Sequence, residues 1–417
     1  MTAVARERLR LALDLMARRA DDSTAVTIEG RAKSEADPCP DLALAPVPSA
    51  TTNATLGEQL REAGWKEVAP LVYVLDVDRV ETAGAASFGS VGRPPPSLLP
   101  VGARREDCVY YDTETTGFSG AGVVVFLVGL AWWEGEALRL RQVFLADYPG
   151  EPEFLRYLKQ QVSRFRVFVS YNGKAFDSHL LKSRFVLSGM TLAFGYQLDL
   201  LHVSRRLWRS ITADCRLTTI ERHVLGWQRS GDVPGWMVPD VYFECLRSGN
   251  LGTMPAVFSH NKLDVVTLAH LLDALDALIA GRDLGVATDA AALGNLLLQR
   301  GEPNAVAVLS RAYDEGDIEA GRLLSLHYKR CHETDQALLL WQDMFDRHRS
   351  LFAAVELSKH HEHRQRDYAA ALAYLLPYRV IERALGDSSE LGKRIHRLRG
   401  KIARPGSTIS RRGTAVS

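Results

Sequence analysis

The pattern of apolar and polar positions changes twice along the chain of 417 residues. Residues 21–56 are rich in Ala, Asp, Ser, Thr and Pro without a sustained apolar period, and consecutive prolines stiffen residues 92–100. A short helix over 56–63 and an apolar run over 68–75 are the regular segments before this proline stretch. We therefore expect residues 1–100 to be a largely disordered or irregular N-terminal region.

Residues 101–283 carry the pattern of a mixed α/β domain. Three apolar runs joined by tight turns predict an antiparallel meander of strands over 108–111, 123–133 and 138–145. A further strand is predicted at 167–171, between segments of helical spacing. The predicted helices are 151–164, 178–187, 198–208, 217–225, 240–247 and 256–279. This order predicts a mixed sheet flanked by helices.

From residue 287 to residue 402 the pattern predicts helix pairs only. Ala305, Ala337 and Ala371 open similar helices and are 32 and 34 residues apart, which is close to the tetratricopeptide period. An unrelated helical bundle with a coincidental period is the alternative. After Glu390 the chain has eight Lys or Arg residues and no acid, which predicts a solvated arm that could contact a polyanion, with 403–417 as a basic flexible tail.

Composition excludes several classes of protein. Lysine and arginine number 51 against 50 acids, so net charge does not indicate a polyanionic partner. The five cysteines are scattered without a C-x-x-C pair, which argues against a disulfide framework or a zinc site and fits a reducing cytoplasm. The longest apolar run, near 123–133, is too short to cross a bilayer, so we expect a cytoplasmic protein without a membrane partner.

The first candidate metal-binding residues are Asp112 and Glu114. They are two residues apart on a predicted strand, so their side chains lie on the same face of it. Two close carboxylates repel each other, and a hard cation such as Mg²⁺ or Mn²⁺ between them removes that cost. Ordinary surface acids are the alternative. Asp177 follows another predicted strand at a helix start, where helix capping is the alternative role. His260 and Asp264 are four residues apart and share one helical face.

Together these residues supply four carboxylates, about the number that two divalent ions need when phosphate and water complete their shells. Two such ions can clamp the attacking and leaving oxygens of a phosphoryl displacement. A histidine beside them can take the proton from the attacking water.

The motifs D-x-E-T-x-G, N-G-x-x-F-D and H-x-x-x-D, in this order, resemble those of the DEDD 3′→5′ exonucleases of the ribonuclease-H-like fold. More narrowly, the chain is similar to bacterial YprB-type ribonuclease-H-like proteins with tetratricopeptide-like helices. The resemblance implies an exonuclease domain over 101–283 and two Mg²⁺ or Mn²⁺ ions per site. It implies that Asp112, Glu114, Asp177 and Asp264 are metal ligands and that His260 is the general base. The histidine subgroup usually spaces His and Asp by five residues, whereas this chain spaces them by four, as the tyrosine subgroup does.

Nucleic-acid contacts are expected beside the acids and along residues 201–229, where six arginines face only two acids. Trp208 and Trp227 lie among these arginines and could stack on unpaired bases. A solvated helix face with two core tryptophans is the alternative. The candidate nucleic-acid-binding residues are Thr115, Asn172, Lys174, Arg205, Arg206 and Arg209.

The function expected from the sequence is metal-dependent hydrolysis of phosphodiester bonds from a free 3′ end, with the helical repeats docking a protein partner or bracing the nuclease domain. Two alternatives stay open. One is a nucleic-acid-binding or scaffold protein that keeps the fold without turnover, and the other is a structure-specific endonuclease.

Overall fold

The computed structural model describes residues 55–80, 98–117, 122–378 and 389–403. Within them the chain forms two compact units, divided between Thr288 and Asp289. The segments expected to be irregular before residue 55, most of the proline stretch and the basic tail beyond residue 403 lie outside the described residues.

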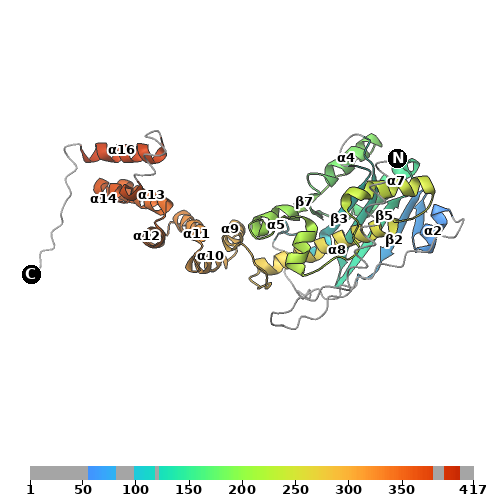
Figure 1. Cartoon of the computed structure of the whole chain (residues 1–417), viewed down its shortest axis with the longest axis horizontal. Helices are drawn as coiled ribbons and strands as arrows, with labels where there is room; N and C mark the ends of the chain where they lie inside the picture. Colours follow the sequence, from blue (N-terminus) through green and yellow to red (C-terminus); the bar gives the residue numbers. More distant parts are fainter. Residues whose placement is uncertain (1–54, 81–97, 118–121, 379–388, 404–417) are drawn as a thin grey trace, which may run out of the picture. The chain divides into compact units, whose positions relative to one another are not determined.

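A seven-stranded mixed sheet forms the centre of the first unit, with the strand order β1-β2-β5-β4-β3-β6-β7 (Figure 1). The central meander of β3, β4 and β5 is antiparallel, as the sequence predicted, and β6 and β7 pair parallel on the far side of β3. The strands are β1 (Lys66–Ala69), β2 (Val72–Val77), β3 (Cys108–Thr115), β4 (Val125–Glu134), β5 (Ala137–Leu145), β6 (Val167–Ser170) and β7 (Tyr196–Asp199).

Two strands come from the region that we expected to be largely disordered or irregular. The helix α2 (Leu56–Glu62) is closed at its N-terminus by a capping box between Thr55 and Glu58. The apolar run after it becomes β2, whose residues from Val72 to Val77 pair with Leu145 to Leu140 of β5. Buried side chains such as Val72 and Val74 join the core of the sheet. The sequence showed the apolar run but not its partner, which lies about seventy residues further along the chain.

Helices cover both faces of the sheet. The long α8 packs across β3, β4 and β5 (Figure 1). The helix α3 packs on β5. The helices of this unit are α2, α3 (Glu151–Val162), α4 (Asp177–Leu187), α5 (Leu200–Trp208), α6 (Leu217–Ile220), α7 (Val238–Ser248) and α8 (Met254–Ile279), with a π-helical turn at Glu221–Leu225.

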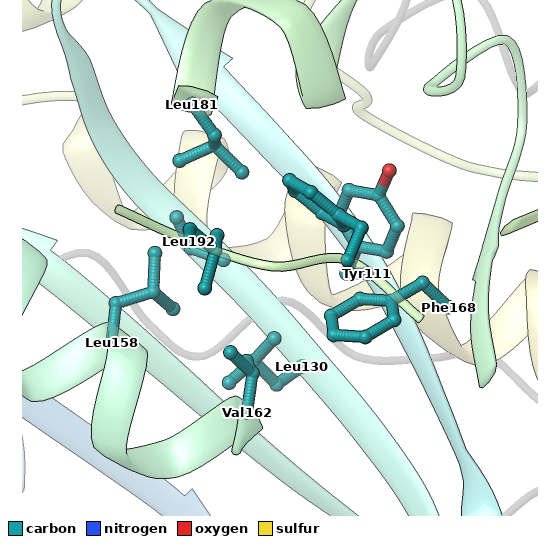
Figure 2. A pocket seen from close by; sticks show the side chains of 9 residues that line it. Tyr111, Leu130, Leu158, Val162, Phe168, Leu181 and Leu192 are labelled. Atoms are coloured by element: carbon teal, nitrogen blue, oxygen red, sulfur yellow. The ribbon is translucent and has the colours of Figure 1, made fainter. Parts of the chain in front are cut away.

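The face of β3 opposite α8 is apolar over Val109 and Tyr111, which are both buried in the core. Its Tyr111 lines a pocket with side chains of α3 and α4, and the hydroxyl of Tyr111 points away from that pocket (Figure 2). The hydroxyl lies 2.7 Å from Oγ of Ser178 at the start of α4. The labelled lining residues are Tyr111, Leu130, Leu158, Val162, Phe168, Leu181 and Leu192. This packing fixes the orientation of β3, so its alternate residues must face α8.

The second unit is helical throughout its described residues. Successive helices pack on one another, and α9 also contacts α11, two helices further along. Ala305, Ala337 and Ala371 are all buried, so small side chains stand where helices meet. The helices are α9 (Ala290–Arg300), α10 (Ala305–Asp314), α11 (Ile318–Arg330), α12 (Thr334–His348), α13 (Leu351–His360), α14 (Tyr368–Ala373) and α16 (Glu390–Ile402).

The basic segment after Glu390 is not a solvated arm up to residue 402, which corrects the expectation from its charge. Ile395 and Leu398 of α16 are fully buried. The carboxylate of Glu362, which is also fully buried, binds three cations of this helix. They are Arg394, Arg397 and Lys401 at 2.8, 2.9 and 2.9 Å. Pairing and apolar contact therefore hold the helix against α14 and the turn that carries Glu362.

Over the same described residues, none of the helices combines the length and the apolar character that a membrane span requires.

Candidate active site

Asp112 and Glu114 stand at the C-terminal end of β3 and both face α8. The amide Nδ2 of Asn261 in α8 donates to Oδ2 of Asp112 at 2.9 Å. The Nε2 atom of His260, one residue earlier, lies 4.0 Å from Oε1 of Glu114. Adjacent residues of one helix therefore meet both acids, which confirms that the i and i+2 side chains share a face of the strand.

A buried chain of amides, which the motifs of the sequence do not reveal, holds Asp112 in place. Nε2 of Gln142 donates to Oδ1 of Asn261 at 3.0 Å and to the carbonyl of Phe258 at 2.8 Å. With Oδ1 occupied, the Nδ2 group of Asn261 turns toward Asp112. Asn261 and Gln142 are at most 1% exposed, so water does not compete for these bonds. Gln142 of β5 and Asn261 of α8 therefore determine together how Asp112 is oriented.

His260 and Asp264 lie one helical turn apart on α8, as their spacing predicted. Nε2 of His260 is 3.4 Å from Oδ2 of Asp264. One ligand atom each from Glu114, His260 and Asp264 lies within 4.8 Å of the others. The structure therefore brings three of the five predicted catalytic residues into one cluster, with Asp112 on the same strand face as Glu114.

Asp177 reaches the site from the other side of β3. It is the first residue of α4, whose N-cap is Phe176. Oδ1 of Asp177 accepts a hydrogen bond from the hydroxyl of Thr113, the residue between Asp112 and Glu114, and the backbone N–H of Asp177 itself also bonds to its carboxyl group. Asp199 is the N-cap of a different helix, α5, and its Oδ1 accepts the backbone N–H of Leu201 at 3.1 Å and that of Asn172 at 2.8 Å.

The acids of the site interact strongly. Burial and the charges of Asp264, Glu114 and Asp177 raise the pKa of Asp112 well above its ordinary value. Burial and the charge of Asp264 do the same to the pKa of Glu114. Burial raises the pKa of Asp177 to about 6, although the Thr113 bond opposes the rise. These carboxyl groups share one region of negative potential that nearby protein cations do not fully neutralise.

His260 has a second partner that the sequence analysis did not identify. Its Nδ1 lies 2.6 Å from Oδ1 of Asp232, in the loop before α7. Burial lowers the pKa of His260, but the bond to Asp232 and the charges of Asp264 and Asp232 outweigh it and raise the pKa to about 9. A cation bound among the same carboxylates opposes that rise, because it repels the imidazolium charge.

One of the six arginines expected to face nucleic acid is internal. The side chain of Arg229 is 6% exposed and pairs with Glu221, Asp232 and Asp264. The two tryptophans are also internal, because Trp208 is fully buried and Trp227 is 9% exposed. Their position is that of core residues, and the expectation that they stack on bases is wrong.

The remaining candidate contacts lie at the surface or at the end of β3. Arg205, Arg206 and Arg209 are exposed at the C-terminal end of α5. Asn172 and Lys174 are exposed beside Asp177, and Asn172 has a left-handed backbone with φ +64°. The hydroxyl of Thr115 donates to the carbonyl of Gly117 at 2.7 Å. Sequence reasoning overlooked Trp236, four residues after Asp232, whose surface is 53% exposed.

The donor set fits a hard divalent cation. It consists of carboxylate oxygens with one imidazole nitrogen, and oxygen ligands suit Mg²⁺ and Mn²⁺. Burial and the neighbouring carboxylates raise the pKa of Asp112 and of Glu114, and a positive charge beside them would favour their ionised forms. Asp112, Glu114, Asp177 and Asp264 are the residues that could hold it.

This fold and site place the chain among known proteins. The RNase_H superfamily model matches residues 109–276, which run from β3 into α8. The chain is 30% identical over 323 residues to the "Uncharacterized protein YprB" of Bacillus subtilis (strain 168), covering 74% of this chain and 76% of the relative. The chain therefore belongs to the YprB family of ribonuclease-H-like proteins.

Among solved structures, the chain is similar to the family B DNA polymerase of the hyperthermophilic archaeon Pyrobaculum calidifontis. The match is 15% identical with a TM-score of 0.32, and covers 46% of this chain and 28% of the polymerase. The chain thus corresponds to little more than a quarter of that protein's length. At this TM-score the similarity defines neither the fold nor the activity.

Proposed function

We propose that this protein is a metal-dependent 3′→5′ exonuclease that hydrolyses phosphodiester bonds of nucleic acid. The observation that supports the proposal is the convergence of Glu114, His260 and Asp264 within 4.8 Å, on the face of β3 that also carries Asp112. The residues come from elements far apart in the chain, and the mutual repulsion of the carboxylates costs stability unless a cation offsets it.

The four acids would hold two Mg²⁺ or Mn²⁺ ions. When bound, such ions neutralise negative charge that develops on the oxygens of the reacting phosphate. Side chains of the protein would accept the proton and hold the metal-binding acids in position. Nδ1 of His260 is bound by Asp232, so Nε2 is the nitrogen that faces the carboxylates and would take a proton from the attacking water. Asn261 keeps Asp112 in place during this step.

The exposed arginines of α5 would hold the nucleic-acid backbone, because guanidinium groups match phosphate oxygens. Asn172 and Lys174 would contact the terminal nucleotide beside Asp177. The helical unit, with buried alanines near the tetratricopeptide period, would dock a protein partner. The four described cysteines are free, in agreement with the cytoplasmic location that we propose.

The test is cleavage of labelled oligonucleotides by wild-type protein and Asp112→Ala with Mn²⁺. Wild type is expected to shorten a 5′-labelled strand progressively and to release mononucleotides from a 3′-labelled one, and the variant is expected to do neither. Internal fragments would indicate an endonuclease, and binding without cleavage in Mg²⁺ and Mn²⁺ would indicate a scaffold. Unaltered cleavage by Asp112→Ala would remove the site assignment.

A further inference from the structure

Arg229 connects the acids around the site to one another. Its Nη2 lies 2.6 Å from Oε2 of Glu221 and 2.6 Å from Oδ1 of Asp264. Its Nη1 lies 3.3 Å from Oδ2 of Asp232. Glu221 is only 2% exposed and also accepts a hydrogen bond from Thr267 at 2.5 Å. The guanidinium is thus anchored on a buried carboxylate, and its planar shape fixes where the other two acids stand.

Asp232 links Arg229 to His260. Its two oxygens are divided between two partners, with Oδ2 on Arg229 and Oδ1 on Nδ1 of His260 at 2.6 Å. The imidazole is therefore held through Nδ1, the nitrogen that faces away from Glu114 and Asp264. Its Nε2 atom points toward these two acids and lies 4.0 Å from Oε1 of Glu114 and 3.4 Å from Oδ2 of Asp264.

The imidazole of His260 needs a second contact to keep a single orientation. The side chains of His260 and Asp264 leave the same face of α8 one turn apart, and without a second contact the imidazole could rotate about two bonds. Arg229 fixes one oxygen of Asp264 and, through Asp232, the plane of the His260 ring.

We propose that Arg229 and Asp232 are positioning residues of the active site, which orient Asp264 and His260 without touching the substrate. The inference rests on the proposed function, because orientation matters only if His260 acts on a reacting group. A purely structural ion network is the competing explanation. The two differ in what happens to turnover when Asp232 is changed in a protein that stays folded.

Asp232 is the residue to change, because its side chain is 21% exposed and lies in a loop, whereas loss of Arg229 would leave Glu221 buried without its cation. For Asp232→Ala we expect kcat to fall by about 10- to 100-fold, the usual effect of losing an outer-shell partner. The KM for the oligonucleotide should stay within about twofold, since ground-state binding is not involved. Asp232→Asn should recover part of the loss, because its amide oxygen still accepts the Nδ1 proton.

The matched control is Glu244→Ala, which removes an exposed acid paired with Arg247 on α7, outside the site. It should leave kcat unchanged. A kcat within about twofold of wild type in Asp232→Ala would overturn the positioning role. A loss confined to KM, or a failure of Asp232→Asn to recover any of the lost kcat, would overturn it as well.

A second readout separates this inference from the proposed function. In ¹⁵N-histidine-labelled protein, the Nδ1 signal of His260, assigned with His260→Gln, should report a bonded proton that Asp232→Ala removes. An inactive wild type that shows this signal would reject the nuclease proposal and leave the orientation intact. An active wild type whose signal does not depend on Asp232 would reject the positioning role alone.

Discussion

Asn261 occupies the space in which a side chain at Gly129 would stand. A Cβ built on Gly129 would collide with the Oδ1 atom of Asn261 and lie 3.0 Å from Cγ1 of Val265. β4 therefore needs a glycine where α8 crosses it, and this close approach brings the amide of Asn261 to Asp112.

Gly129→Ala is therefore expected to damage both the fold and the site. Displacing Asn261 should cost about 1–3 kcal/mol in the free energy of unfolding, as overpacked cores do. It should also lower cleavage, because Asp112 loses its amide donor. Urea denaturation and initial cleavage rates measure the two effects. Gly235→Ala is the control, since a Cβ there meets no atom within 4 Å. Equal stability of the two variants would contradict the close approach.

Asp112→Asn should stabilise the cation-free protein while removing its response to metal. A carboxyl group whose pKa is raised by folding costs stability at neutral pH, where it must ionise, so its removal is favourable. Wild type should gain about 2.7 kcal/mol when Mn²⁺ is present at roughly 100 times its Kd, and the variant should gain much less.

The measurement is the Tm in EDTA and in Mn²⁺, with Glu134→Gln as the control. Glu134 is an exposed acid paired with Arg139 at 2.8 Å, away from the cluster. An Asp112→Asn protein that melts lower in EDTA and shifts upward with Mn²⁺ as wild type does would rule out the acid cluster as the cation site.

Replacing Arg205 and Arg206 with Ala should weaken oligonucleotide binding and reduce its dependence on salt. Each lost phosphate contact should lower the slope of log K against log salt by about one. Fluorescence anisotropy across a salt series measures the slope. Arg156→Ala, which removes an exposed arginine of α3, should leave it unchanged. An unaltered slope in the double variant would mean that α5 presents an ordinary solvated face.

The contact between Glu362 and α16 predicts a loss of order in acid. Burial opposes ionisation of Glu362, but Arg397 and Lys401 outweigh it and hold its pKa at about 2. Because this pKa is lowered on folding from 4.5, the stabilisation is complete above that value and disappears as the pH falls toward 2.

Glu362→Gln should remove this acid dependence and weaken α16 by on the order of 2 kcal/mol at neutral pH, since bonds to a charged group are lost. Hydrogen exchange of peptides from α16, compared at pH 7 and near pH 3, measures the effect. Glu390→Gln changes an exposed acid on the same helix and is the control. Protection of α16 that is equal at both pH values in wild type would contradict the prediction.

The sequence predicted the meander and its acids because both depend on local periodicity. Alternation along β3 places Asp112 and Glu114 on one face, and the helical period pairs His260 with Asp264. It did not predict β7, because the segment Tyr-Gln-Leu-Asp lacks the continuous apolar run that marks β6. It did not reveal Asp232 or the burial of Arg229, because their loop has no periodic pattern and their partners lie about thirty residues away.

The outermost strand of the sheet also affects how copies of this protein behave at high concentration. β1 has only four residues, begins with the charged Lys66 and Glu67, and carries a bulge between Glu67 and Ala69. A short, charged edge strand with a bulge is a poor template for backbone pairing with a neighbouring molecule. The N-terminal strands thus cover β5, a nine-residue strand whose backbone would otherwise be an exposed edge open to pairing with another molecule.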